Sequence, residues 1–539
     1  MGTKAYDNFA DLITFSRVSG GTALRHVGYG DELVTNGTFD TDTSGWSANG
    51  SPLVSVVAGQ ARVQENGGSN PSIYQAFSTT IGSVYKVETF MDNASSAAVR
   101  VNAVDSASAF GTNWRILSSV RGSLQTNYIV ATATTTYIHL LISAASGLGL
   151  VGFFDNISVK EVIFDRASDP LVLFNHPANI PRVEYAADGS RKGLLIEEAR
   201  TNLVTYSQDF TNAAWTKTNA ATLALDATGP DGVSNSAVTL VDNGAGGTSF
   251  VSVRVNSVTV LTNTPYTLSC FMKADQLTWG RLQLNNFTTA SGQGAYFDLA
   301  GGAVGAVGSE ITSANIEPYG DGWYRCSVTF TSDAVDTLGD ILILPAEADG
   351  DVVLPLDGTS SILIYGAQFE AGAFPTSYIP TLSGSTVTRS ADVASMPVSA
   401  FGYNPKAGTV VVDLNSFGDN TYQYAVALTP TSATGAFEIS LRKSVSNWNY
   451  SVSDNSVVQA SINEAFSAQA KLAGAYKANS FNASINGSVE VEDTSGTVPS
   501  GLVDLRIGRQ TSFQLNGHIK SIAYYPRRLS NVQLQELTA

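Results

Sequence analysis

Two long stretches of the chain, residues 36–162 and 206–372, share one plan of short alternating apolar and polar runs separated by turn residues. Each stretch contains an aromatic-rich run, Tyr85–Met91 in the first and Tyr266–Met272 in the second. The repeat period is far longer than that of a solenoid, so the pattern indicates duplication of a whole domain. Short alternating runs between Gly, Ser, Asn and Asp turns predict a β-sandwich for each copy.

The composition extends this β prediction to the whole chain. Only 14% of the 539 residues are charged, against about 25% in an average protein. Gly, Ser, Thr and Asn replace the missing charge, and they favour turns and pleated surfaces over charged amphipathic helices. A chain of this length needs about three or four domains, because a single core does not grow to that size. The net charge of −16 repels a phosphate backbone, so we expect no nucleic-acid partner.

Two cysteines, Cys270 and Cys326, are too few for a disulfide framework. Strand alternation places each on an apolar face, Cys270 with Leu268 and Cys326 with Val328. We expect two buried free thiols, which suits assembly in a reducing cytoplasm, although the sequence leaves open a disulfide between them.

The chain carries no predicted membrane segment. No run of 18 apolar residues occurs, so we expect no membrane insertion. Met1–Phe9 lacks a basic region followed by an apolar run and is not expected to be a secretory signal. Met1-Gly2 begins like a myristoylation motif, but Tyr6 stands where that motif needs Ser or Thr.

The first copy carries motifs of a known family. It opens with Asn36-Gly-Thr-Phe39 and Trp46 and closes with Phe154-Asp-Asn-Ile-Ser-Val159. In these motifs it resembles the galactose-binding-like jelly rolls, a family that includes many carbohydrate-binding modules. The resemblance implies jelly rolls for residues 34–162 and 206–393.

The last part of the chain carries motifs of a second family. Phe481–Gly487 runs into an Asn-Gly turn, the strongest short hairpin signal. Ser530 can cap a short helix whose Leu534 and Leu537 face inward. The order of the final strands and this helix resembles the concanavalin A-like, laminin-G-type lectin sandwiches. The resemblance implies a self-contained lectin-like sandwich over residues 398–539.

Two phrases about 165 residues apart bracket the second copy. The first is Gly193–Leu203, and the second is Gly366–Pro380, which is followed by Val387–Val393. In this arrangement the chain resembles phage virion proteins of the tail-fibre or head-spike type. That resemblance implies a virion location, with assembly in the bacterial cytoplasm, and a homo-oligomer, for which a trimer is one candidate. It leaves head or tail placement open.

The N-terminal part is split by the first copy. Phe15–Ala23 resembles the usual start of the first virion phrase, and its expected continuation arrives only at Asn179–Tyr185. We therefore expect residues 1–33 and 163–205 to form one anchoring module that contacts other virion proteins, with the jelly roll 34–162 inserted into it.

No catalytic pattern occurs in the sequence, and we expect no enzyme. The four histidines are scattered over different modules, and no metal-binding spacing or nucleophile elbow is present. Glycoside cleavage needs two paired acids. The nearest acidic cluster, Glu490–Asp493, follows a hairpin and lacks the spacing of concanavalin-like glucanases, so we interpret it as a solvated edge.

Aromatic side chains beside polar residues are candidates for sugar binding, because pyranose faces stack on rings while hydroxyls need hydrogen bonds. For each of them, core packing is the alternative. Trp448 and Tyr450 attract most interest, because their i, i+2 spacing puts both rings on one sheet face beside Asn447 and Asn449. The candidates are Trp46, Trp114 and Tyr137 in the first copy, Trp279 and Tyr296 in the second, and Trp448, Tyr450 and Tyr403 in the last domain.

Asp40, Asp42 and Asp155 are candidate ligands for a structural calcium ion, which both sandwich types often bind on their loops. We expect no other cofactor.

The sequence thus favours a structural virion protein that binds host surface polysaccharide. A polysaccharide-degrading enzyme that carries these modules and a bacterial glycan-binding adhesin are the alternatives. The sugar specificity and the oligomeric state stay open.

Overall fold

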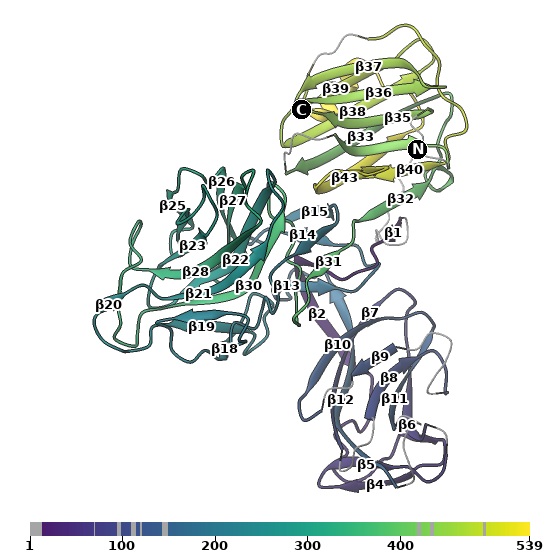
Figure 1. The fold of residues 1–539 in the computed structure, drawn as a ribbon. Helices are drawn as coiled ribbons and strands as arrows, with labels where there is room; N and C mark the ends of the chain where they lie inside the picture. The colour runs from purple at the N-terminus through teal and green to yellow at the C-terminus, as the bar shows by residue number, and fades with distance from the viewer. Residues whose placement is uncertain are drawn as a thin grey trace. The chain divides into compact units, whose positions relative to one another are not determined.

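The computed structural model describes residues 13–68, 70–93, 99–108, 115–118, 121–142, 149–417, 422–431, 436–488 and 492–539. The chain divides into two compact units, residues 26–170 and residues 1–25 with 171–539. Its described residues form antiparallel sheets that pack as tandem β-sandwiches, which confirms the all-β prediction (Figure 1). Among these residues no helix is long and apolar enough to cross a membrane.

The unit of residues 26–170 is a sandwich. One core holds apolar side chains of both its sheets, among them Ile73, Ile138 and Phe154. One sheet contains β10 (Gln125–Val130), β7 (Val84–Asn93), β12 (Val151–Phe164) and the part of β2 (Gly21–Glu32) from His26 onward, extended by β5 (Gln60–Gln64) and β4 (Leu53–Val57). The other contains β3 (Ser47–Asn49), β6 (Ser72–Ser78), β11 (Thr135–Ile142), β8 (Val99–Val104) and β9 (Arg115–Ser118).

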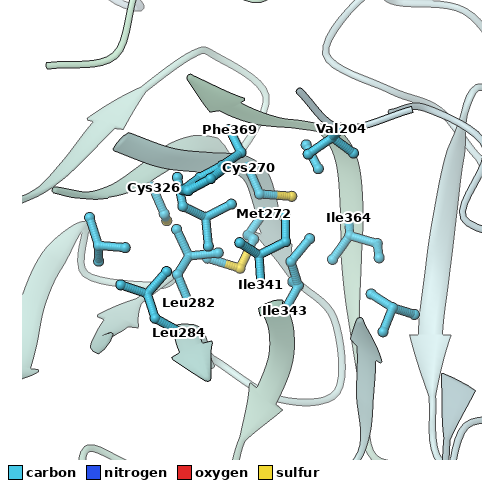
Figure 2. Close-up of a cluster of buried hydrophobic side chains, with 14 of the residues drawn as sticks. Val204, Cys270, Met272, Leu282, Leu284, Cys326, Ile341, Ile343, Ile364 and Phe369 are labelled. Carbon is cyan, nitrogen blue, oxygen red and sulfur yellow. The ribbon is translucent and has the colours of Figure 1, made fainter. Parts of the chain in front are cut away.

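The second copy forms a sandwich of two six-stranded sheets. Their inward side chains form one core, of which Figure 2 shows a part with Cys270, Cys326 and Met272. The first sheet has the order β17 (Thr216–Thr218), β21 (Ser252–Thr259), β28 (Leu338–Ala346), β23 (Trp279–Asn285), β24 (Gly294–Asp298), β25 (Ala303–Val307). The second has the order β18 (Leu225–Ala227), β19 (Ala237–Val241), β30 (Ser361–Ala371), β22 (Pro265–Ala274), β27 (Trp323–Thr331), β26 (Ser313–Pro318).

The structure confirms that both cysteines are buried free thiols. Cys270 and Cys326 are direct partners across β22 and β27, and both lie on the core face. Burial raises the pKa of both thiols well above the ordinary value, so they stay protonated and unreactive at neutral pH.

The C-terminal sandwich also has two sheets and one core. Helix α1 (Asn531–Thr538) begins with the predicted cap, a capping box between Ser530 and Gln533, and buries Leu534 with Leu537 beside it. The first sheet has the order β1 (Thr14–Ser16), β32 (Val393–Pro397), β40 (Asp504–Ile507), β34 (Gln423–Thr429), β35 (Glu438–Ser444), β36 (Asn447–Asp454), β37 (Val457–Ala465). The second has the order β14 (Val183–Tyr185), β15 (Arg191–Ile196), β43 (Gly517–Tyr525), β33 (Ala407–Ser416), β38 (Gln469–Lys477), β39 (Asn482–Ile485).

The C-terminal sandwich is therefore not confined to residues 398–539. Four strands, β1, β14, β15 and β32, come from outside that range and hydrogen-bond at the edges of both sheets. The self-contained sandwich expected from the sequence differs from the structure in this respect. The strand signals after residue 398 predict a sandwich, but they do not show which distant segments pair with the edges of its two sheets.

The two virion-type phrases meet in space. Strand β16 (Arg200–Asn202) of the first phrase pairs with β31 (Val387–Arg389), which follows the second. The Asn202 side chain donates to the carbonyl oxygens of Ala367 and Ile379, both in the second phrase. The two phrases are therefore joined by strand pairing and by side-chain hydrogen bonds.

Candidate functional site

The sugar-binding prediction for Trp448 and Tyr450 is wrong in this structure. Both rings are fully buried in the C-terminal core. The Trp448 indole donates to the carbonyl oxygen of Ser467 at 3.0 Å, and the Tyr450 hydroxyl donates to that of Ala475 at 3.1 Å. The i, i+2 spacing correctly predicted that the rings share a face, but that face points inward, where no sugar can stack.

The first-copy candidates have different surroundings. Trp46 is half-buried, packs on Phe39 with ring centroids 5.3 Å apart, and donates to the carbonyl oxygen of Asn36, so its role is structural. Trp114 lies outside the described residues. Tyr137 is half-buried on the outer face of its sheet, 5.9 Å from the ring of Tyr74. The Tyr137 ring is therefore partly accessible to a ligand.

The three candidate calcium ligands serve local turns. Asp42 accepts from the backbone of Ser44 at 2.9 Å and from the Asn36 amide, while Asp155 accepts from the backbone of Asn156. Asp40 accepts from Thr38 at 3.0 Å. Among the described residues, no group of three acidic, histidine or cysteine side chains is gathered for a metal. The calcium site stays a prediction.

In the acidic cluster near residue 490, Glu492 is held by neighbouring side chains. Glu492 accepts from Ser480 and pairs with Arg528 at 3.1 Å, whereas Glu490 lies outside the described residues.

A groove of about 320 Å³ runs over the outer face of the sheet that begins with β17 in the second sandwich. Alternation along the strands builds it: Val253, Leu282 and Ile343 point into the core, so their neighbours point outward. It is lined by Thr218, Phe250, Ser252, Arg254, Gln283, Asn285, Leu342, Leu344 and Val352.

Apolar and polar side chains alternate across the groove. Leu342 on β28 stands between Arg254 on β21 and Gln283 on β23, all in register. Phe250, which also lines the groove, exposes 42% of its surface. Leu342 and Leu344 are almost completely buried, so Phe250 and the half-buried Val352 supply the apolar surface that a ligand can reach.

The polar groups of the groove are held in place. Asp340 lies 3.6 Å from the Arg254 guanidinium, whose Nε is buried without a hydrogen-bond partner. The Gln283 amide donates to Asn285 Oδ1 at 2.9 Å, and the same oxygen accepts from the backbone of Gly292. A ligand would therefore meet preorganised donors and acceptors.

The second-copy candidates Trp279 and Tyr296 lie on this outer face beside the groove. Arg281 covers the Tyr296 ring at 4.8 Å, and burial lowers the pKa of that arginine. The Trp279 ring lies against Gly305, where an added Cβ would come within 2.6 Å of it. The sequence indicated this outer face of the sheet through Trp279 and Tyr296. It did not indicate Phe250, Gln283, Leu342 or Leu344, because these residues belong to no recognisable motif.

The lining of the groove has groups that can bind a sugar. No carboxylate, histidine or cysteine is among the groove's lining residues, all of which the structure describes. Apolar patches can take the C–H face of a pyranose, while amide and guanidinium groups can bond its hydroxyls.

A buried ionic cluster joins three charged residues of the virion-type phrases, Glu197, Arg389 and Asp392, to Arg17 and Arg182, which lie outside the phrases. Arg182 contacts Asp392 at 2.5 Å and Glu197 at 2.8 Å, Arg17 contacts Asp392 at 3.2 Å, and Arg389 contacts Glu197 at 3.4 Å. Burial alone would raise the pKa of Glu197, but Arg389 and Arg182 lower it well below its usual range. These phrases are therefore structural in this chain.

No protein-family model matches the chain, and no curated protein matches it. Among solved structures, the chain is similar to the N-terminal CBM22-1-CBM22-2 tandem domain of Xyn10C from Paenibacillus barcinonensis, at 10% identity and a TM-score of 0.22, covering 64% of this chain and 98% of that one. An anti-sigma factor domain-containing protein follows at 12% identity and a TM-score of 0.09, covering 55% and 86%. TM-scores this low carry no argument about function.

Proposed function

We propose that this chain is a structural protein of a phage or phage-like particle that binds host cell-surface polysaccharide and has no catalytic activity. The observation that carries the binding role is the groove on the second sandwich, which the exposed Phe250 ring lines together with Arg254, Gln283 and Asn285. Glycans need this combination, because each sugar ring has apolar faces and a rim of hydroxyls.

The particle role is supported by the sequence. The phrases Gly193–Leu203 and Gly366–Pro380 resemble those of virion proteins, and the net charge of −16 would keep a densely displayed protein soluble. A single shallow groove binds weakly, but many copies on one particle would multiply its strength. The N-terminal segments would contact other virion proteins.

The groove can be tested by removing its exposed ring. Phe250→Ala in the full chain should weaken binding to surface polysaccharide by about fivefold to tenfold, since one aromatic contact contributes on the order of 1 kcal/mol. Leu261→Ala is the matched control, because Leu261 is 69% exposed and is not among the residues lining the groove. Binding can be measured by biolayer interferometry on polysaccharide from cells that the particle adsorbs to.

Two outcomes would overturn the proposal. Equal binding by Phe250→Ala, Gln283→Ala and the unchanged protein would remove the groove from the binding role. Release of reducing ends from the polysaccharide, lost on substitution of one carboxylate, would establish an enzyme instead. Antibodies against the chain should label intact particles by electron microscopy if it is a virion component.

A further inference from the structure

A second cleft lies within the unit of residues 1–25 and 171–539. Its volume is about 400 Å³, and three parts of the unit line it: the outer face of β26 and β27, the segment of residues 373–377 from the second virion-type phrase, and the C-terminal sandwich with its strands β14 and β15. Clefts between modules are common ligand sites, because side chains from independent surfaces converge there. The cleft is separate from the groove, with which it shares no lining residue.

One wall of the cleft is aromatic. Phe374, from the second virion-type phrase, and Phe417, at the end of β33, have ring centroids 5.7 Å apart. Arg200 lies 5.0 Å over Phe374, and His518 packs against the edge of Phe417. Both phenyl rings are only half-buried, so part of each ring is accessible to a ligand.

The opposite wall is a ladder of hydroxyl and amide groups. Asn315 pairs with Ser327 and Ser313 pairs with Thr329 across β26 and β27. These side chains stand on the outer face, because the alternate residues of β27 point into the core. A ligand here meets several groups that both donate and accept hydrogen bonds.

Four ionisable side chains of the cleft lie in two hydrogen-bonded pairs. Lys192 bonds to Glu317 at 2.5 Å, and His518 shares a hydrogen bond of 2.5 Å with Glu184. Arg325 is buried, donates to Ser269 at 3.0 Å, and keeps its Nε without a partner. A charged ligand would have to displace these pairs, whereas an uncharged ligand with many hydroxyls can bond to their free lone pairs and protons.

We propose that this cleft is a second saccharide site, for a neutral oligosaccharide stacked on Phe374 and Phe417 and hydrogen-bonded along Asn315 and Ser327. The proposal rests on the proposed function for its ligand class, but not on the groove. A saccharide bound here would contact three parts of the unit at once and would stabilise it against unfolding by mass action.

The test uses the full chain and a panel of neutral hexasaccharides (cello-, xylo-, malto- and chitohexaose), observed by saturation-transfer NMR. Asn315→Trp should block the cleft with little effect on folding, because Asn315 is exposed. For a hexasaccharide that binds, Asn315→Trp should abolish the cleft signals and Phe417→Ala should weaken this binding by about fivefold. Phe250→Ala, which alters the groove, should leave the cleft signals intact, and thermal melting checks the fold of each variant.

The outcomes separate the two proposals. Loss of binding in Asn315→Trp but not in Phe250→Ala supports the cleft. Loss only in Phe250→Ala overturns the cleft and leaves the groove standing. If no hexasaccharide of the panel gives a signal that Asn315→Trp removes, the cleft is not a saccharide site.

Discussion

The buried ionic cluster allows one sharp test of how the chain is held together. Three arginines, Arg17, Arg182 and Arg389, surround two carboxylates, Glu197 and Asp392, and all five side chains are almost completely buried. The formal charge of the cluster is therefore +1. Asp392→Asn keeps the volume of the side chain and raises the charge to +2.

The expected cost follows from the geometry. Asp392 contacts Arg182 at 2.5 Å and Arg17 at 3.2 Å, and it accepts from the backbone of Glu197 at 2.9 Å. Breaking a buried pair by neutralising one partner leaves an uncompensated charge away from water, which costs about 3–5 kcal/mol. Asp392→Asn should thus remove about 4 kcal/mol from the stability of this unit.

Arg17→Met makes the reverse change. It takes the charge of the cluster from +1 to zero, and burial together with the neighbouring Arg182 already lowers the pKa of Arg17 to about 10. Arg17 is thus incompletely compensated, and its loss should cost less than the loss of Asp392. The surface control is Asp321→Asn, whose partner Lys273 lies at 3.2 Å with the Asp321 side chain 84% exposed. That change should cost less than about 1 kcal/mol.

Pulse proteolysis in urea suits this measurement, because a chain of several sandwiches does not unfold in one transition. Mass spectrometry of the surviving fragments identifies which part has opened. If Asp392→Asn destabilises no more than Asp321→Asn, or less than Arg17→Met, the cluster does not hold these segments together by charge compensation.

Three further predictions concern other parts of the chain. Burial lowers the pKa of His139 to about 4, so the folded state holds the imidazole neutral. The unit of residues 26–170 should therefore be fully stable above pH 6.5 and lose stability as the pH falls from there towards 4. His139→Gln should reduce this pH dependence, as urea titrations at each pH can show. Cys270 and Cys326 should react with a thiol reagent only after unfolding, so rapid labelling of the native protein would contradict their burial. The fragment 398–539 lacks β1, β14, β15 and β32, so the edges of β40 and β43 are exposed in it. Its melting temperature, measured by circular dichroism, should be lower than that of the same sandwich in the full chain. It should also aggregate through these exposed edges, as light scattering can show.

The local chemistry of the sequence determined much of this molecule. Short alternating runs and turn residues predicted tandem β-sandwiches, the alternation around Cys270 and Cys326 placed both thiols in a core, and Ser530 marked the start of the closing helix. These features depend on neighbours in sequence, so the period of two and the capping pattern are enough to predict them.

Long-range pairing and the direction of a face were decided only by the tertiary structure. Trp448 and Tyr450 share a face, as predicted, but whether it turns to water depends on which sheet lies opposite. Glu197, Arg389 and Asp392 of the virion-type phrases meet Arg17 and Arg182, which lie outside both phrases, in a buried cluster that the sequence pattern did not indicate. The groove and the cleft bring together side chains from strands that are remote in sequence. Sheet register decides which residues become neighbours across strands, and no local sequence pattern records that register.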